Sequence, residues 1–462
     1  MAQHHVIIGG GPAATNALET IRIYDSEAKI TLVSDEPAHS RMALPYWLAG
    51  KIQLEQTHTG DDAHFEKLGV DTRFGMRVAK INASGNSVAL SDGSTLSYDN
   101  LLIATGSSPL SPPISGTDLP GVQPLWSLAH TQQLLDGISG NEKPRVVLVG
   151  AGFIGFIVLN AMFKRGWDLT VVERESQVLP RMLDGESAGF VQNWLSAKGV
   201  TVHASTSVQS ISSGDGGEKL VQLESGEQIA ADIVIIATGI KANLDLVDGT
   251  GIDSDEGILV NDQMQSSVPN IYAAGDVAQG PVMFSDQRSV HAIQPTAVDH
   301  GRVAGANMAG QDVHYPGSLL MNVVDVCGLQ TVSYGAWDDA TAEATTISNP
   351  INSIYRKLLW HDDRLVGAIF TGQADDLGML TDIGMVKGIL QTQTKLGPWK
   401  RYLTKNAFDI RRAYIGAGVA QKLVRTTLLG SATKDRKYHF EGAEPKTIMG
   451  ASHAQFVGTK PK

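Results

Sequence analysis

The 462-residue chain contains a single cysteine, Cys327. A disulfide framework, a CxxC redox pair, a four-cysteine zinc site and a cysteine-ligated iron–sulfur cluster each need at least two thiols, so all four are excluded. Any redox chemistry must therefore be carried by a bound group. Cys327 lies far along the chain from the glycine motifs described below, and we expect it to be a buried structural thiol.

Long apolar runs are also missing. No run approaches the ~18–20 residues that a membrane span needs, and the first five residues lack a basic region before the strand-like Val6, Ile7 and Ile8. We therefore expect a soluble, cytoplasmic protein with no membrane span.

Basic residues are in the minority, with 37 Lys and Arg against 48 Asp and Glu and a formal net charge of −11. Phosphate groups would be repelled by such a chain, so we do not expect nucleic acid or an anionic membrane as a partner. The histidines, including His58 with His64 and His291 with His300, carry no metal-ligand motif around them, and we predict no metal site.

Glycine, in contrast, is abundant, with 49 residues. The hydrophobic content of 42% is that of a globular protein. The glycines therefore indicate tight turns or phosphate-binding loops rather than disorder. The length predicts roughly three domains.

An internal duplication organises the chain. Residues 6–14 and 146–155 each read as a strand ending in a glycine-rich turn, followed by a helix (to about Ala28 and about Arg165) and a second strand (30–33 and 169–173). Each copy continues into a meander and the tetrapeptide Ile-Ala-Thr-Gly. The spacings of 6 and 7 that separate Gly93, Asp99 and Gly106 recur for Gly226, Asp232 and Gly239. The chain therefore contains two Rossmann-like βαβ units, each interrupted by a β-meander.

Both turns match the GxGxxG/A pattern, as Gly9, Gly11 and Ala14 and as Gly150, Gly152 and Gly155. Such a turn lets the backbone approach a pyrophosphate and directs the amides of the following helix toward it. An acid about 20 residues later accepts hydrogen bonds from the ribose, and Glu173 fits this position in the second copy. A carboxylate there favours NAD(H) over NADP(H), although the adjacent Arg174 weakens the preference. In the first copy Ser34 holds this position, so Asp35 or Glu36 would take the role.

Further along the chain, residues 269–277 read as a strand ending in Gly275 and Asp276, and a helix is predicted from about Pro295 to Met308. From about Tyr315 the pattern changes to strands (321–326, 355–359, 365–370) and a helix (377–390), which indicates a third, α+β domain. Residues 426–462 have weak periodicity and a local excess of basic residues, and we expect an extended tail.

The motifs in this order resemble the FAD-dependent pyridine nucleotide-disulfide oxidoreductase superfamily over roughly residues 5–425. The resemblance implies an α/β protein with an FAD-binding domain (1–110 and 240–314) that is split by an NAD(H)-binding domain (111–239). A C-terminal α+β interface or dimerisation domain (315–425) and the extended tail (426–462) follow. The order of motifs that carries the resemblance is Gly9-x-Gly11, Ala104-Thr105-Gly106, Gly150-x-Gly152-x-x-Gly155, Ala237-Thr238-Gly239 and Ala274-Gly275-Asp276.

The resemblance also implies roles for single residues. Gly9, Gly11 and Ala14 would lie at the FAD pyrophosphate, Arg41 near the FAD phosphates, and Asp276 at the ribityl or phosphate region. The helix that begins near Thr296 would direct its positive end at the isoalloxazine. The other residues expected to bind a cofactor are Asp35, Glu36, Ala104, Thr105, Gly106, Gly150, Gly152, Gly155, Glu173, Thr238, Gly239 and Gly275.

Within the superfamily, residues 40–46 and 355–369 look most like NADH:rubredoxin reductases and the flavin portion of NAD(P)H nitrite reductases. Met42 stands where the thiol-using branch has its redox cysteine. Tyr46 and Ile157 stand where many relatives have a Lys–Glu pair near the flavin. No catalytic side chain is assigned; Tyr46 and His291 are candidate flavin contacts.

The function expected from the resemblance is the transfer of electrons from NADH through FAD to an iron–sulfur electron carrier or a partner subunit, or in reverse to NAD+. One alternative is an NADH oxidase that uses oxygen. Another is the flavin subunit of a multi-subunit complex of the 2-oxoacid dehydrogenase type, with or without substrate chemistry of its own. A homodimer or a component of a hetero-oligomer is expected.

Overall fold

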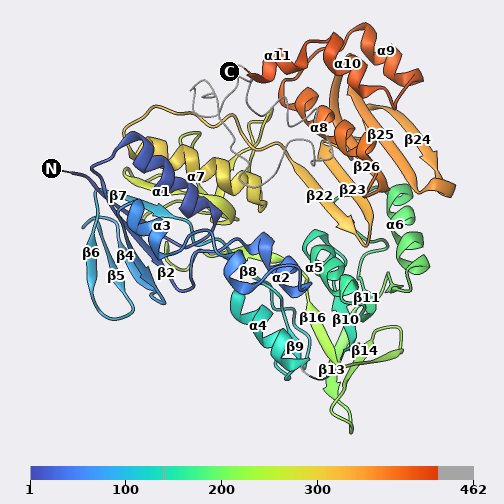
Figure 1. The fold of residues 1–462 in the computed structure, drawn as a ribbon, viewed down its shortest axis with the longest axis horizontal. Coiled ribbons are helices and arrows are strands. Elements are labelled where there is room, and N and C mark those ends of the chain that lie inside the picture. Colours follow the sequence, from blue (N-terminus) through green and yellow to red (C-terminus); the bar gives the residue numbers. More distant parts are fainter. Residues whose placement is uncertain (1, 139, 141, 425–462) are drawn as a thin grey trace, which may run out of the picture.

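The computed structural model describes residues 2–138, 140 and 142–424 (Figure 1). The predicted tail at 426–462 lies outside the described residues. The described chain forms two parallel sheets with their meanders and one antiparallel sheet, which confirms the predicted α/β class with two Rossmann-like units and a C-terminal α+β part.

The first parallel sheet combines segments from both ends of the first 310 residues. Its strands are β1 (His4–Ile8), β2 (Lys29–Ser34), β3 (Val70–Phe74), β7 (Asn100–Ile103) and β19 (Ile271–Ala273). They lie in the order β19-β7-β1-β2-β3, and each neighbouring pair is parallel. Val6, Ile7 and Ile8 are buried, as expected for a central strand that is covered on both faces.

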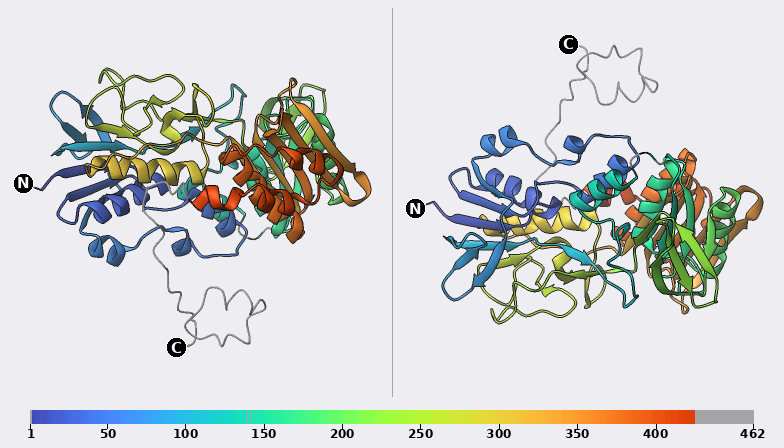
Figure 2. Two further views of the ribbon diagram at one scale, coloured as in Figure 1. Left: turned by 90° about the horizontal axis from the view of Figure 1, so that it is seen from above. Right: turned by 90° about the horizontal axis from the view of Figure 1, so that it is seen from below.

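Two helices lie side by side against this sheet, α1 (Pro12–Tyr24) and α7 (Gln294–Met308) (Figure 2). Their close approach depends on glycine. A Cβ atom on Gly301 would lie 2.2 Å from the carbonyl oxygen of Ala13, and one on Gly305 would lie 2.5 Å from that of Ala17. A larger residue at either position would force the two helices apart.

Helix α1 ends at Tyr24, not near Ala28 as the sequence predicts. The Asp25 side chain accepts hydrogen bonds from the backbone N–H groups of Glu27 and Ala28, at 2.9 and 3.0 Å. This Asp-centred turn competes with further helical bonds and ends the helix early.

The second parallel sheet repeats the first. Its strands are β9 (Val122–Gln123), β10 (Arg145–Val149), β11 (Asp168–Val172), β12 (Thr201–His203) and β16 (Ile233–Ile236), in the order β12-β11-β10-β16-β9. The helices of this unit are α4 (Leu128–Gly137), α5 (Phe153–Lys164) and α6 (Gly185–Ala197).

Each unit carries a three-stranded antiparallel meander at the same place, as predicted. The first is β4 (Val78–Asn82), β5 (Ser87–Leu90) and β6 (Thr95–Ser97); the second is β13 (Val208–Ser213), β14 (Lys219–Leu223) and β15 (Gln228–Ala231). The chain passes between the units through an antiparallel pair, β8 (Ser107–Pro109) with β17 (Ile240–Ala242).

The segment between β2 and β3 contains α2 (Leu44–Leu48) and α3 (Asp62–Lys67), with 3-10 turns η1 (Arg41–Ala43) and η2 (Leu54–Thr57). Helix α2 packs against α5 of the second unit. The turn η3 (Gly275–Val277) and a small sheet of β18 (Ile258–Leu259), β20 (Ala278–Pro281) and β21 (Arg288–Val290) precede α7 in the chain.

The C-terminal part is an antiparallel sheet of order β22-β23-β26-β25-β24. Its strands are β22 (Met321–Val326), β23 (Leu329–Gly335), β24 (Glu343–Asn349), β25 (Ile354–His361) and β26 (Arg364–Gln373), and η4 (Pro350–Asn352) connects β24 to β25. Helix α8 (Leu377–Gln391) covers one face of this sheet, and α9 (Pro398–Lys405), α10 (Ile410–Gly416) and α11 (Val419–Val424) follow. Within the described residues no helix is long and apolar enough to cross a membrane.

Candidate functional site

The first glycine loop joins β1 to α1 in a conformation that its sequence requires. Gly9 has φ +110°, and a Cβ atom there would lie 2.2 Å from the carbonyl oxygen of Ala104. Gly11 is the N-cap residue of α1, and no heavy atom of the described chain outside its neighbours lies within 4 Å of where its Cβ would be. No described side chain caps this helix, so no side chain satisfies its first amides, and they suit an anionic group.

The second loop repeats this geometry at the start of α5. Gly150 has φ +102°, and a Cβ atom there would lie 2.5 Å from the carbonyl oxygen of Ala237. Gly152 caps the helix and has the same open surroundings as Gly11. A Cβ on Gly155 would meet the carbonyl oxygen of Gly150 at 2.5 Å, which explains the third glycine. In the first loop the buried Ala14 takes that third position.

Glu173 follows the second strand of its unit and returns to the glycine loop. One carboxylate oxygen accepts a hydrogen bond from the backbone N–H of Ala151 (2.6 Å), and the other accepts from the N–H of Glu175 (2.8 Å). The residue is buried, at 8% exposed. Each oxygen keeps a free lone pair, so the carboxylate can also accept from a ribose hydroxyl.

The corresponding place in the first unit is different. Ser34 faces Gly10, since a Cβ on Gly10 would lie 2.8 Å from the Ser34 hydroxyl oxygen. Asp35 instead forms an exposed ion pair with Arg77 at 2.7 Å. Glu36 lies 3.7 Å from the ring of His39.

Arg41 and Asp276, which are 235 positions apart, meet beside the first loop. Arg41 Nη1 donates to Asp276 Oδ2 at 2.9 Å, and the Ser107 hydroxyl donates to the same oxygen at 2.8 Å. The Arg41 guanidinium also lies 3.8 Å from the centre of the Trp126 ring. Burial lowers the pKa of Arg41, and the Asp276 carboxylate opposes this shift.

The Ala-Thr-Gly segments are part of the same surroundings. Gly106, with φ +68°, lies against Arg41, because a Cβ there would be 3.5 Å from Arg41 Nη2. The Thr105 carbonyl accepts from the Asn243 amide at 2.8 Å. Gly239 has φ +134°, and its backbone carbonyl accepts from the N–H of Leu110, so this segment is held by the β8–β17 connection.

The N-terminus of α7 approaches the same region. The Ser40 hydroxyl donates to Gln294 Oε1 at 2.9 Å, which ties α7 to the segment that carries Arg41. Thr296 is buried, and its hydroxyl lies 3.2 Å from His291 Nδ1. The backbone N–H of Met321 can only donate, so His291 Nε2 is the acceptor in their contact, at 3.4 Å. Nδ1 of the neutral ring therefore carries the proton and donates to Thr296. Burial lowers the pKa of His291.

Gly275 packs against the first turn of α1 beside the site. It has φ +77°, and a Cβ atom there would lie 3.2 Å from the Cβ of Ala13. The structure therefore brings Gly9, Gly11, Arg41, Gly106 and Asp276 into one region. The sequence interpretation missed Ser107 and Trp126. No local pattern marks either one, because their partners lie far away in the chain.

Two side chains of the segment where the thiol-using branch has its cysteine are exposed. Met42 is 41% and Tyr46 is 57% exposed. Ile157 lies on α5, which packs against α2, the helix of Tyr46. Cys327 is instead buried in the turn between β22 and β23, where its carbonyl accepts from the Trp194 indole at 3.1 Å. Burial raises the pKa of its thiol to about 12.

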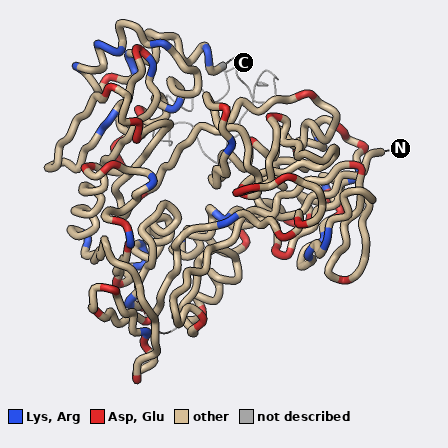
Figure 3. The backbone as a smooth tube through the Cα atoms, turned by 180° about the vertical axis from the view of Figure 1, so that it is seen from behind, with Lys and Arg blue, Asp and Glu red and all other residues tan. Residues whose placement is uncertain are grey.

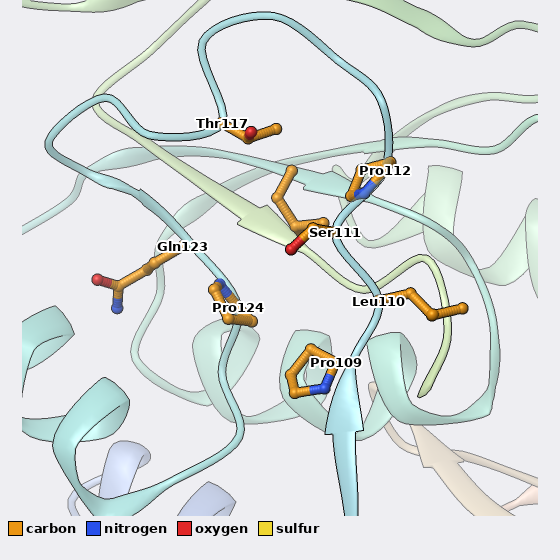
Figure 4. A pocket seen from close by; sticks show the side chains of 8 residues that line it. Pro109, Leu110, Ser111, Pro112, Thr117, Gln123 and Pro124 are labelled. Carbon is orange, nitrogen blue, oxygen red and sulfur yellow. The ribbon is translucent and has the colours of Figure 1, made fainter. Parts of the chain in front are cut away.

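A small pocket of about 140 Å³ lies beside the carboxyl end of β16 (Figure 4). Its lining consists of three prolines, two aliphatic residues and three polar residues: Pro109, Pro112, Pro124, Leu110, Ile236, Ser111, Thr117 and Gln123. Ligand sites for drug-sized molecules enclose ~300–1,000 Å³, so this pocket is too small for a dinucleotide. No cluster of three or more potential metal ligands occurs within residues 2–424 as far as they are described.

The residues present fit two dinucleotides. Each unit offers an uncapped helix N-terminus behind a glycine loop, and the first adds the Arg41 cation. This arrangement defines a protein with two nucleotide-binding βαβ units, one inserted in the other. The chain belongs to the pyridine nucleotide-disulphide oxidoreductase family, whose model matches residues 3–301. It is an NAD(P)H-dependent flavin oxidoreductase, with FAD and NAD(H) as cofactors.

Comparison with known proteins gives relatives that match most of this chain. The chain is 30% identical to the NADH-dependent phenylglyoxylate dehydrogenase subunit epsilon of Aromatoleum evansii over 413 residues, which is 88% of this chain and 96% of that protein. It is 34% identical to an NADH oxidase of Methanocaldococcus jannaschii, over 67% of this chain and 71% of that protein. The crystal structure of a covalent putidaredoxin reductase–putidaredoxin complex shares the fold, with a TM-score of 0.81 and 22% identity over 90% of this chain and 99% of that one.

Proposed function

We propose that this chain exchanges electrons between NAD(H) and a separate iron–sulfur protein or partner subunit. The observation that carries the proposal is the lack of a redox thiol beside the site: Met42 holds the cysteine position, and the sole cysteine is buried in the β22–β23 turn. Electrons that enter from NADH cannot be stored on a protein disulfide, so they leave the chain.

The cofactor sites follow the two glycine loops. We propose that residues 1–110 and 240–314 hold FAD, through Gly9, Gly11, Ala14, Arg41 and Asp276. Residues 111–239 would hold NAD(H), through Gly150, Gly152, Gly155 and Glu173, and residues 315–425 would form an interface. FAD, when bound, supplies the conversion between two-electron chemistry with NAD(H) and one-electron chemistry with a metal centre.

The chain's own residues prepare this site in three ways. The amides of α1 and the Arg41 guanidinium neutralise phosphate charge. Asp276 and Trp126 fix the Arg41 side chain. The positive end of α7, with Thr296 oriented by His291, favours negative charge nearby.

The distribution of charge supports an acidic protein partner. Residues 394–424 hold seven Lys and Arg and one Asp in a chain whose net charge is −11. These basic residues lie on and around α9, α10 and α11 (Figure 3). A basic surface on an acidic protein attracts an acidic carrier and speeds its association. We expect the complex to operate in the cytoplasm, where NADH is available.

The relative from Aromatoleum evansii matches nearly its full length and is itself a subunit of a dehydrogenase, which supports assignment of this chain to a larger complex. The NADH oxidase relative favours a second candidate, direct use of oxygen.

Anaerobic titration with NADH, followed by mixing with an acceptor, tests the proposal. We expect the bound flavin to be fully bleached by one equivalent of NADH, because no disulfide takes up a second electron pair. We also expect faster reoxidation by an acidic [2Fe–2S] ferredoxin than by air. Uptake of two equivalents would contradict the thiol-free assignment, and reoxidation by air at least as fast as by ferredoxin would favour the oxidase.

A further inference from the structure

We propose that Trp126 is a positioning residue for Arg41, supplied to the first nucleotide site by the second unit. Trp126 lies in the segment between β9 and α4, outside every glycine motif. The inference rests on the proposed binding of FAD at the first glycine loop.

Four residues form a closed ring of contacts. The Arg41 guanidinium stacks 3.8 Å from the centre of the Trp126 ring, and the Trp126 indole N–H donates to the backbone carbonyl of Ser107 at 2.7 Å. The Ser107 hydroxyl and Arg41 Nη1 both donate to Asp276 Oδ2. Each residue of the ring therefore touches the next, although the four come from four separate segments of the chain.

The ring holds the guanidinium on two sides. Asp276 binds an edge of the planar group, and Trp126 covers a face, which a planar and weakly hydrated cation accepts readily. A free arginine side chain loses much rotational freedom when it is fixed on a phosphate. Trp126 already restricts the Arg41 side chain in the apoprotein. FAD binding therefore costs less side-chain entropy than it would with a free arginine.

The position of Arg41 connects the ring to the glycine loop. Its Nη2 lies against Gly106, two residues after Ala104, and the carbonyl of Ala104 packs on Gly9. The first site therefore depends on a side chain from the second unit. A substitution of Trp126 should weaken FAD binding without altering the glycine loop itself.

Trp194 provides a matched control. Its indole N–H also donates to a backbone carbonyl, that of Cys327, and Lys198 Nζ lies 4.8 Å from its ring. Trp194 thus combines the same two kinds of contact on α6, against the β22–β23 turn instead of the glycine loops. Both tryptophans are half-buried, so loss of the indole as such should affect both positions alike.

The experiment measures the Kd of FAD for the apoprotein by fluorescence quenching, together with apoprotein thermal unfolding. We expect Trp126→Leu to raise the Kd about tenfold, equivalent to about 1.4 kcal/mol. Trp126→Phe, which keeps the aromatic face, should raise it less, and Trp194→Leu should leave it within about twofold of wild type. An unchanged Kd in Trp126→Leu would overturn the inference.

A double-mutant cycle separates positioning from general destabilisation. In an Arg41→Ala background, Trp126→Leu should have little further effect on the Kd; an equal tenfold loss there would overturn the inference.

If Trp126→Leu fails to fold, Arg41→Lys tests the same stack, because lysine keeps the charge but not the planar face. Wild-type affinity in Arg41→Lys would then overturn it. Failure of the proposed FAD site is distinct, because Arg41→Ala would then also leave the Kd of FAD unchanged.

Discussion

At the scale of the residue, backbone amides hold the carboxylate of Glu173 in position. Its two oxygens accept hydrogen bonds from the amides of Ala151 and Glu175, so the side chain has little freedom to turn away from the second glycine loop. In nucleotide-binding units of this kind, a carboxylate at this position accepts from the ribose 2′-hydroxyl of NAD(H), and its charge repels a 2′-phosphate.

Replacing Glu173 with alanine should therefore raise the KM for NADH more than the KM for NADPH. Hydrogen bonds to a charged group contribute about 1.5–3 kcal/mol, so we expect a rise of roughly tenfold or more for NADH. Steady-state kinetics with both nucleotides measure the difference, with the exposed Glu175→Ala as control. Equal effects on the two nucleotides would show that Glu173 does not contact the ribose.

Cys327 is a second residue whose surroundings decide its chemistry. Burial raises its pKa to about 12, so at neutral pH the thiol stays protonated and unreactive. We expect the native protein to react with Ellman's reagent only after unfolding, and Cys327→Ala to keep NADH-dependent bleaching of the flavin. Rapid labelling of the folded protein, or loss of bleaching in the variant, would refute a purely structural role.

At the scale of the element, the first and second glycines of the strand–loop–helix unit have different surroundings. Gly9 needs φ +110° and packs on the Ala104 carbonyl, whereas Gly11 has an ordinary φ of −80° and open surroundings. The two positions therefore report on different properties of the same loop.

Gly9→Ala should lower the free energy of unfolding by roughly 2–4 kcal/mol, because a Cβ both clashes with a carbonyl and strains the backbone. Gly11→Ala should fold with near wild-type stability but bind FAD more weakly, since its methyl group would project toward the phosphate. Thermal unfolding of both apoproteins and FAD titration measure the two effects. Normal FAD binding by Gly11→Ala would argue against the pyrophosphate position.

Helix α7 carries a buried histidine that the site does not use. His300 is 1% exposed, its ring packs edge-on against Tyr315 at 4.8 Å, and neither ring nitrogen makes a hydrogen bond with a described residue. Burial lowers its pKa to about 3. In the unfolded chain the ring titrates near 6.5, so the unfolded state binds the extra proton first as the pH falls.

The free energy of unfolding should therefore decrease below pH 6.5, by up to about 1.4 kcal/mol per pH unit from this residue, until about pH 3. His300→Phe keeps the ring packing and removes the titration, so its stability should fall less between pH 7 and pH 4. Chemical denaturation at a series of pH values measures this. Parallel pH curves for the two proteins would contradict the pKa shift of His300.

At the scale of the whole molecule, Asp184 joins the second unit to the C-terminal sheet. It caps α6 by accepting from the N–H of Ser187, and it also accepts from the Tyr355 hydroxyl (2.8 Å) and Lys357 Nζ (2.9 Å) on β25. Burial raises the pKa of Asp184, but the hydrogen bonds from Ser187, Lys357 and Tyr355 outweigh it, and the pKa is lower than usual. This contribution to stability is present above the ordinary pKa of the carboxyl and is lost as the pH falls through the lowered one.

Asp184→Ala should lower the free energy of unfolding by roughly 2–4 kcal/mol, because it removes a helix cap and leaves two donors without their partner. Glu186→Ala, on the exposed first turn of the same helix, should have little effect. Urea denaturation of both variants makes the comparison, and a similar loss in both would show that Asp184 does not link the two parts.

The features that the sequence predicts best are those set by short stretches of chain. The glycine loops, the paired meanders and strands such as β22 follow from residue type within about ten positions, because a positive φ or an alternating pattern is a local requirement. The short helices α9 to α11 and the edge strand β24, with its polar run Glu343–Asn349, carry weaker patterns and were not predicted.

By itself, then, the sequence determined the two nucleotide-binding units, their cofactor class and the absence of a thiol at Met42, because each depends on which residue stands at one place. Only the tertiary structure decided which distant side chains meet. The ring of Arg41, Ser107, Trp126 and Asp276 and the contact of Asp184 with β25 join segments from 19 to 235 positions apart. Such contacts arise from the packing of whole elements and leave no trace in the local pattern of either partner.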